Sequence, residues 1–220
     1  AGAGETIGII GGTGSGKSTV VNLIPRFYDA SAGQVCFLGQ DVRKYRRKEL
    51  RDQIGIVPQK AVLFAGTVRE NMQWGKKDAT DEEIWEALKT AQAEEFIRAK
   101  EGGLDANIEQ GGRNLSGGQR QRLTIARALV KKPRVLILDD SASALDYATD
   151  AALRKAIRQM EGAPTVFIVS QRTSSLMSAD RILVLDDGEA TGYGTHEELL
   201  KNCQTYREIY NSQYGKKEEA

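Results

Sequence analysis

The chain has 220 residues, and its 31 lysines and arginines nearly balance its 30 aspartates and glutamates. A chain of this length forms one large α/β domain or two small lobes. The balanced charge gives no general attraction to nucleic acid or to an anionic membrane surface. No apolar run approaches the ~18 residues of a membrane-spanning helix, and no signal peptide is expected before the first strand. Cys36 and Cys203 lack a metal-ligand pattern and are predicted to be reduced thiols in the cytosol.

The first motif is a glycine-rich turn between an apolar strand, Ile7 to Ile10, and the start of a helix. Gly11, Gly16, Lys17 and Ser18 fill the pattern G-x-x-x-x-G-K-[ST] of a phosphate loop. Glycines let backbone N–H groups turn onto phosphate oxygens. Lys17 is expected to reach the β- and γ-phosphates, and the Ser18 hydroxyl to ligate Mg²⁺. The loop residues predicted to contact the nucleotide are Gly11, Thr13, Gly14, Ser15, Gly16, Lys17, Ser18 and Thr19.

Short apolar runs predict two further strands. Gln34 to Leu38 is expected to be a strand that ends in a turn at Gly39 to Asp41. Tyr45 to Asp52 is a basic turn or short helix, interpreted as a solvated face, with a phosphate or RNA role as the alternative. Ile54 to Val57 is a buried strand, and Gln59 follows it.

From Thr67 to about Lys100 the apolar residues recur at helical spacing. A capped helix is predicted to start at Asp81. Trp85 and Phe96 are interpreted as core residues, with ligand contacts as the alternative. This region is interpreted as a helical lobe inserted into the α/β unit. The predicted division is a core of residues 1–66 and 132–220 and a lobe of residues 67–131.

Leu115 to Gln119, with the sequence LSGGQ, leads directly into a helix, Arg120 to Val130. Glycines and a serine at a helix N-terminus describe an anion site. This second phosphate site is not expected to serve the same nucleotide as the first.

The apolar strand Val135 to Asp140 ends in two carboxylates. In a phosphate-loop protein Asp139 holds Mg²⁺, usually through water, and Asp140 faces the γ-phosphate, where a water must be oriented. The alternative is that both carboxylates cap the following helix.

The rest of the chain alternates between strand and helix patterns. Ser143 to Asp146 turns into a helix, and Thr165 to Val169 is a strand with Gln171 just beyond its C-terminal edge, where ligands gather in open α/β sheets. A hairpin of residues 181–194 precedes a helix from Thr195 to Tyr214, capped by Thr195 and Glu198.

In this order the segments resemble the nucleotide-binding domain of an ABC transporter over essentially the whole chain. The resemblance rests on the phosphate loop, Gln59, Leu115 to Gln119, Val135 to Asp140 and Ser143 to Asp146. The sequence LSGGQ is close to diagnostic of that family. The resemblance implies a RecA-like P-loop α/β core, a small antiparallel β element and a helical lobe that carries the signature. It also implies ATP and Mg²⁺ as ligands, and it suggests that the N-terminal strands are partly missing.

Domains of this family dimerise head to tail and sandwich two ATP molecules. The resemblance implies that Lys17 and its loop hold one ATP, whereas the signature completes the site of the partner domain. Gln59 would contact Mg²⁺, together with Ser18 and Asp139, and relay to the membrane helices, and Asp146 would cross the dimer interface. The signature residues assigned to the partner's ATP are Ser116, Gly117, Gly118 and Gln119.

Several stretches resemble exporters in particular, in which this domain follows six membrane helices. They are Arg26 to Tyr28, Asp41–Val42, Val62 to Val68 and Glu109 to Gly112. Glu109 stands where exporters place a loop that contacts the transmembrane part. The chain therefore resembles a cassette at the cytoplasmic face of a membrane, without its membrane portion and without the aromatic residue that stacks on adenine. The sequence does not indicate which substrate is transported.

Two positions depart from the family pattern. Asp140 stands where a catalytic glutamate is usual, which draws the carboxylate back by ~1 Å and can cost ~10²-fold in rate. Gln171 stands where a histidine is usual, and glutamine cannot shuttle a proton near neutral pH. His196, the only histidine, is not a replacement. The hypothesis is a degenerate ATP site in one half of a heterodimeric exporter. The alternatives are a homodimeric exporter that tolerates both residues, or a laboratory substitution.

Three other functions are found among proteins with these motifs. A soluble ABC ATPase acting on nucleic acid is disfavoured, because the chain has no heptad run and no basic excess, and no nucleic-acid partner is expected. An importer-type subunit is disfavoured by the Glu109 segment. A nucleotide switch that does not hydrolyse ATP would share every motif and differ only in rate.

Overall fold

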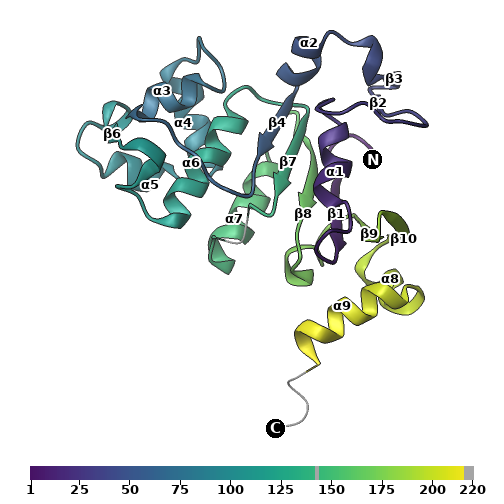
Figure 1. Cartoon of the computed structure of the whole chain (residues 1–220). Coiled ribbons are helices and arrows are strands. Elements are labelled where there is room, and N and C mark those ends of the chain that lie inside the picture. Colours follow the sequence, from purple (N-terminus) through teal and green to yellow (C-terminus); the bar gives the residue numbers. More distant parts are fainter. Residues whose placement is uncertain (142–143, 216–220) are drawn as a thin grey trace. The chain divides into compact units, whose positions relative to one another are not determined.

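The computed structural model describes residues 1–141 and 144–215, and the chain forms two compact units. The first unit comprises Ala1–Arg51 with Thr165–Ala220, and the second comprises Asp52–Pro164. Each unit combines helices with parallel strands (Figure 1), which confirms the predicted α/β class. The finer division into a core and a helical lobe of residues 67–131 stays a prediction.

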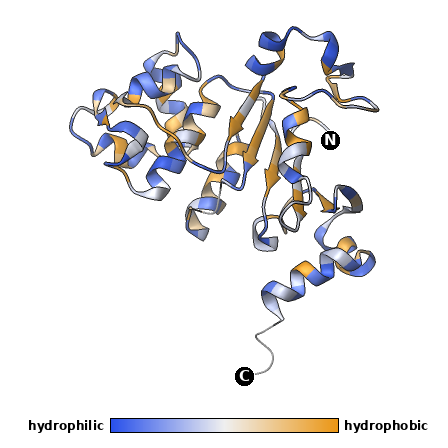
Figure 2. Ribbon diagram, viewed as in Figure 1, coloured by the Kyte–Doolittle hydropathy of each residue, from blue (hydrophilic) through white to orange (hydrophobic). Residues whose placement is uncertain are grey.

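The sheet of the first unit has the strand order β10-β9-β1-β8. β1 (Thr6–Gly11) pairs in parallel with β8 (Thr165–Val169) and with β9 (Arg181–Asp186), and β10 (Glu189–Gly194) runs antiparallel to β9. All six residues of β1 are buried, as expected of a parallel strand with a neighbour on each side. Figure 2 shows β8 of this sheet as mostly hydrophobic.

Apart from two C-terminal helices, the other elements of the first unit are short. They are α1 (Lys17–Leu23), β2 (Cys36–Phe37), β3 (Gln40–Asp41), the 3₁₀ turns η1 (Val42–Lys44) and η4 (Thr173–Ser175), and α2 (Arg47–Asp52), whose last residue belongs to the second unit. The predicted turn at Gly39 to Asp41 is displaced. Leu38 and Gly39 form the turn, with positive φ of 49° and 77°, the combination found in tight hairpins of type I′.

The C-terminal region contains two helices, α8 (His196–Asn202) and α9 (Gln204–Tyr214). The predicted capping box is confirmed, because Thr195 and Glu198 bond each other's backbone N–H. The prediction of one continuous helix was wrong. Cys203 has extended backbone angles, φ −116° and ψ 111°, and its buried side chain places Sγ 3.7 Å from the carbonyl oxygen of Thr191 in β10.

The second unit is built on β4 (Ile54–Val57), which pairs in parallel with β7 (Val135–Asp139). A two-residue ladder joins β5 (Gly66–Thr67) to β6 (Asn107–Ile108). The helices of this unit are α3 (Val68–Gln73), α4 (Asp81–Thr90), α5 (Glu94–Arg98), α6 (Gly117–Leu129) and α7 (Tyr147–Arg158), with 3₁₀ turns η2 (Gly103–Asp105) and η3 (Gln110–Gly112).

Helix α4 begins at Asp81, as predicted, and its N-cap is the residue before it. Thr80, not Asp81, is the N-cap: Thr80 Oγ1 accepts from the N–H of Glu83, and the Glu83 carboxylate accepts from the N–H of Thr80. The hydroxyl and the carboxylate thereby satisfy two backbone donors reciprocally. Asp81 lies in the first turn instead, where its charge favours the helix dipole.

Trp85 and Phe96 were predicted to be core residues, and both are only half-buried. The outer face of each ring is covered by an arginine: Arg98 Cζ lies 4.0 Å from the Trp85 centroid, and Arg122 Cζ lies 4.7 Å from that of Phe96. A guanidinium over an aromatic face is attracted by the ring quadrupole. Both rings are therefore partly covered by arginine side chains and are not enclosed in an apolar core.

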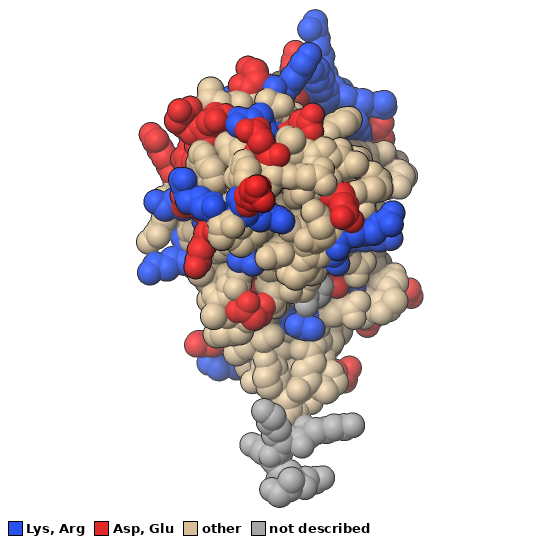
Figure 3. Space-filling view, turned by 90° about the vertical axis from the view of Figure 1, so that its left-hand side faces the viewer, with Lys and Arg blue, Asp and Glu red and all other residues tan. Residues whose placement is uncertain are grey.

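Charged side chains of both signs are interspersed over the face shown in Figure 3, in keeping with the small net charge. Arg46, Arg47 and Lys48 are exposed, as expected of a solvated basic face.

Cys36 and Cys203 are free thiols. Within residues 1–141 and 144–215, no helix combines the length and the apolar character needed to cross a bilayer.

Candidate functional site: a phosphate loop, an acidic strand end and a signature turn

The phosphate loop connects β1, which ends at Gly11, to α1, which begins at Lys17. Gly14 and Gly16 have φ of 83° and 90°, in the left-handed region that side chains disfavour. Gly11 is required for another reason: a Cβ there would collide with the carbonyl oxygen of Leu185 and with Ser15 Oγ. The glycines thus set the path of the loop, and their spacing is a physical requirement of this turn.

Lys17 is buried in this loop and is 8% exposed. Its Nζ donates to the carbonyl oxygens of Gly11 and Gly12, over 2.9 and 2.6 Å, and to Ser15 Oγ over 3.4 Å. Other loop residues face solvent, since Thr13, Gly14, Ser18 and Thr19 are all exposed, whereas Ser15 is buried. A fixed ammonium group beside exposed backbone and hydroxyl groups suits a polyphosphate ligand.

Gln171 lies at the same edge of the sheet as the phosphate loop. β1 and β8 are parallel, with Ile9 opposite Val169, and Ser170 N–H donates to the Ile9 carbonyl over 3.1 Å. The carboxyl ends of both strands therefore coincide, and Gln171 is exposed there. The first unit brings together two of the sequence-predicted groups, as expected of parallel strands that share an edge.

The second unit brings together Gln59 and the two carboxylates. β4 and β7 are parallel, with Val57 opposite Leu138, so Gln59 and Asp140 both follow a strand end. Gln59 Nε2 donates to Asp140 Oδ2 over 3.2 Å. Asp140 has φ of 46°, a rare conformation for a side-chain-bearing residue.

Asp139 is the last residue of β7 and is partly exposed. The Ser141 hydroxyl, two residues further on, is buried and has no hydrogen-bond partner among the residues that the structure describes. Such an orphaned polar group is unusual and marks the acidic strand end as a region not built for stability alone.

The signature residues start α6. Ser116 is the N-cap: Ser116 Oγ accepts from Gln119 N–H over 3.2 Å, and Gln119 Oε1 accepts from Ser116 N–H over 3.0 Å. Ser116 and Gly117 are exposed. A Cβ on Gly118 would lie 3.3 Å from the carbonyl oxygen of Ala144, so the helix start packs closely against the segment that follows the acidic strand.

Two arginines behind the signature were not singled out from the sequence. Arg120 Nη1 donates to the Leu115 carbonyl over 2.7 Å. Arg122 donates through Nη1 to the Gln92 carbonyl over 2.6 Å and through Nε to the Gly118 carbonyl over 3.4 Å. Burial lowers the pKa of Arg122, which still leaves an arginine charged. The sequence pattern carried no signal for these contacts, because their acceptors are backbone carbonyls.

The turn after β7 is described only in part, since Ala142 and Ser143 lie outside the described residues. Asp146 is the N-cap of α7, and its carboxylate accepts from the N–H and the hydroxyl of Thr149, over 2.9 and 2.6 Å. Both bonds favour the carboxylate and hold the pKa of Asp146 below its usual value.

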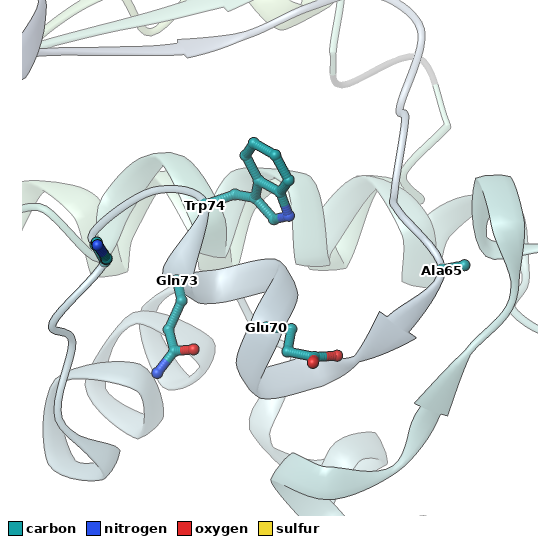
Figure 4. A pocket seen from close by; sticks show the side chains of 5 residues that line it. Ala65, Glu70, Gln73 and Trp74 are labelled. Atoms are coloured by element: carbon teal, nitrogen blue, oxygen red, sulfur yellow. The ribbon is translucent and has the colours of Figure 1, made fainter.

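A surface hollow of about 590 Å³ lies elsewhere in the second unit. Figure 4 shows Glu70, Gln73 and Trp74 on α3 and its C-terminal end, and Ala65 on the segment that leads into β5. The Glu109 segment borders it, because Gln110 Oε1 accepts from Ala65 N–H over 3.4 Å and Gly111 N–H donates to the Leu63 carbonyl over 3.0 Å. None of the predicted nucleotide-binding residues lines this hollow.

These motifs agree with the comparisons with known proteins. The family model for the ABC transporter matches residues 1–143. The chain therefore belongs to the ABC transporter family. Its fold is similar to that of a bacterial Atm1-family ABC exporter solved with ATP bound, with a TM-score of 0.90 and 37% identity over 96% of this chain and 37% of that one.

Two relatives from Bacillus subtilis (strain 168) show how much of such proteins the chain represents. YfiB, an uncharacterised ABC transporter ATP-binding protein, is 49% identical over 212 residues, which are 96% of this chain and 37% of YfiB. YgaD, provisionally named a multidrug export ATP-binding/permease protein, is 43% identical over 210 residues, 96% of this chain and 36% of YgaD. The chain thus spans little more than a third of the length of these relatives.

Proposed function

We propose that the chain is the ATP-binding and ATP-hydrolysing domain of an exporter at the cytoplasmic face of a membrane, powered by head-to-tail dimerisation on ATP. The observation that carries this proposal is the phosphate loop, in which a buried Lys17 stands beside exposed loop residues after a fully buried strand. The family membership and the exporter relatives support it. An importer-type subunit and a nucleic-acid ATPase would share the loop and the family, but the exporter names of the relatives do not favour them.

The oxygen-rich groups of the chain fit Mg²⁺, which prefers hydroxyl, carboxylate and amide oxygens. We assign Ser18, Asp139 and Gln59 to the metal and the loop amides to the phosphates. Bound Mg²⁺ would neutralise charge on the β- and γ-phosphates. These assignments rest on the motif positions, and the hydrogen bond from Gln59 to Asp140 keeps the amide oxygen of Gln59 available as a ligand.

We further propose that this chain's own ATP site is degenerate. Asp140 carries a side chain one methylene shorter than glutamate on a backbone in the left-handed region, and Gln171 offers an amide that cannot take up a proton near neutral pH. The signature, by contrast, is complete. Ser116, Gly117, Gly118 and Gln119 would complete an active site on a partner domain, so a second, different chain is the expected partner.

We place the contact with the transporter's membrane-spanning part at the hollow beside Trp74. The Glu109 segment is bonded to the chain beside this hollow: Ala65, which lines the hollow, donates from its N–H to Gln110 Oε1, and Gly111 N–H donates to the Leu63 carbonyl. Exposed Trp74 stacks on Phe64, with ring centroids 4.9 Å apart. Aromatic side chains exposed together are typical of protein–protein contact surfaces.

The test compares Mg-ATP hydrolysis by the natural chain and by the double variant Asp140→Glu with Gln171→His. If those two residues alone make the site degenerate, the rate rises ~10²-fold or more in the double variant. Adding Lys17→Ala to the double variant should abolish the gain. A high rate in the natural chain, or no gain while ATP still binds, contradicts the degenerate site. Failure of the natural chain to bind ATP contradicts the whole proposal.

A further inference from the structure

The segment that carries Gln171 is held by a side chain from the far end of the chain. Gln213 of α9 donates from Nε2 to the carbonyl oxygen of Gln171 over 2.7 Å. Its Oε1 accepts from both the N–H and the hydroxyl of Thr173, each over 3.0 Å. One amide group therefore spans the two residues on either side of position 172.

The orientation of the Gln213 amide is fixed by the chemistry of its partners. A backbone carbonyl can only accept and a backbone N–H can only donate, so the NH₂ must face Gln171 and the oxygen must face Thr173. An exchange of oxygen and nitrogen would break both bonds to the backbone, and only the bond to the Thr173 hydroxyl could form again with its direction reversed. Thr173 is fully buried, where the loss of a partner for its N–H would be costly.

Helix α9 is docked so that Gln213 points at this segment. Tyr206 is fully buried, and its hydroxyl lies 2.7 Å from Nδ1 of His196. The Tyr210 ring lies 5.5 Å from the His196 ring. Tyr206, Tyr210 and Gln213 are spaced by four and three residues, which places them on one face of the helix.

From this arrangement we infer that Gln213 is a positioning residue for ATP: it fixes the backbone at Gln171 so that the Gln171 amide meets the γ-phosphate. The inference rests on the proposed function, which places Gln171 in this chain's own ATP site, where its amide can hydrogen-bond the γ-phosphate. Gln171 is exposed at the strand edge shared with the phosphate loop. Without the clamp, an exposed glutamine would lose entropy on binding and hold the phosphate less well.

The test uses the dissociation constants of ATP and ADP, since only ATP carries the γ-phosphate. Gln171→Ala should weaken ATP binding by ~10-fold, as expected for one hydrogen bond to a charged group, and leave ADP unchanged. Gln213→Ala should also weaken ATP and spare ADP, by ~3-fold or more, and the double variant should be no worse than Gln171→Ala alone. Gln204→Ala is the matched control, because Gln204 lies on the same helix and bonds only to Glu208 among the contacts described.

A second readout needs no nucleotide. Amide hydrogen exchange at Thr173 should be faster in Gln213→Ala and unchanged in Gln204→Ala. Gln213→Glu keeps the acceptor and loses the donor, so it should preserve protection at Thr173 and still weaken ATP.

The outcomes separate the two ideas. If Gln171→Ala lowers ATP affinity and Gln213→Ala lowers ATP and ADP equally or neither, the positioning role is overturned and the proposed function stands. Unchanged exchange at Thr173 in Gln213→Ala also overturns it. If Gln171→Ala leaves ATP affinity unchanged, the γ-phosphate role of Gln171 fails and the inference falls with it.

Discussion

Gln59 and Asp140, 81 residues apart in sequence, are joined by a hydrogen bond of 3.2 Å from Nε2 to Oδ2. Each follows the carboxyl end of one of the paired strands β4 and β7. The backbone of Asp140 is in the left-handed region, which costs ~1 kcal/mol or more for most residues and least for short polar ones. A strained backbone and a fixed amide together hold the carboxylate in a defined direction.

This bond predicts a charge-dependent effect at position 59. Gln59→Glu replaces the donor by a second carboxylate, and the repulsion should lower the free energy of unfolding by ~1 kcal/mol or more at neutral pH. In an Asp140→Asn background the same substitution should cost much less. Urea unfolding of all four variants measures the coupling. Gln73→Glu, in the same unit, is the control, and equal costs in both backgrounds would refute the pairing.

The phosphate loop predicts a contrast between two adjacent glycines. Gly11→Ala drives a methyl group into the Leu185 carbonyl and should destabilise the chain by ~2–4 kcal/mol. Gly12→Ala meets nothing within 4 Å and should cost less than ~1 kcal/mol. Thermal unfolding of both variants decides the matter. Similar losses would mean that the close approach at Gly11 is not what selects glycine there.

Arg122 should contribute more to the free energy of unfolding than a comparable surface arginine. Arg122→Met removes a charged donor from the carbonyls of Gln92 and Gly118 and should cost ~1–3 kcal/mol. Arg122→Lys should recover only part, because an ammonium lacks the planar fork. Arg98 also stacks on an aromatic ring, but its side chain is exposed and pairs with Glu94 near the surface, so Arg98→Met should cost ~1 kcal/mol or less. Urea midpoints in the reverse order would contradict this ranking.

Tyr206 predicts a loss of stability in alkaline solution. Burial raises the pKa of Tyr206 from 10.0 to about 12, so the folded state favours the neutral phenol. This stabilisation is fully present below pH 10 and is lost as the pH rises from 10 to about 12. The unfolding free energy of the natural chain should fall more steeply across that window than that of Tyr206→Phe. Parallel pH profiles for the two proteins would show that the phenol does not titrate with unfolding.

Much of the fold was predictable because its signals are local. Ile54 to Val57 and Thr165 to Val169 were predicted to the residue, since each is a short run rich in β-branched side chains between a proline on one side and a polar residue on the other. The phosphate loop and the signature were equally accessible, because glycine spacing and helix capping are written within a few residues. The break at Cys203 was missed, since it depends on the burial of that side chain against β10.

The residues of the candidate site also differ in whether a local sequence pattern identifies them. Gln59, Asp139 and Asp140 could be placed at strand ends from the pattern alone. Gln213 could not, since nothing in a polar helix near the C-terminus indicates which glutamine reaches back 40 residues to Thr173. Arg122 was missed for a similar reason, because its acceptors are backbone carbonyls. Side chains that act on distant backbone leave no local trace in a sequence.

The reciprocal cap of α6 gives the signature a hydrogen-bond polarity. Ser116 Oγ and Gln119 Oε1 are turned inward as acceptors for backbone N–H groups, which leaves the serine hydrogen and the first-turn amides to face solvent. The exposed start of the helix therefore presents hydrogen-bond donors and little that could ligate a cation. Such a surface would favour an anionic ligand over a metal ion, because its hydrogen-bond donors complement negative charge.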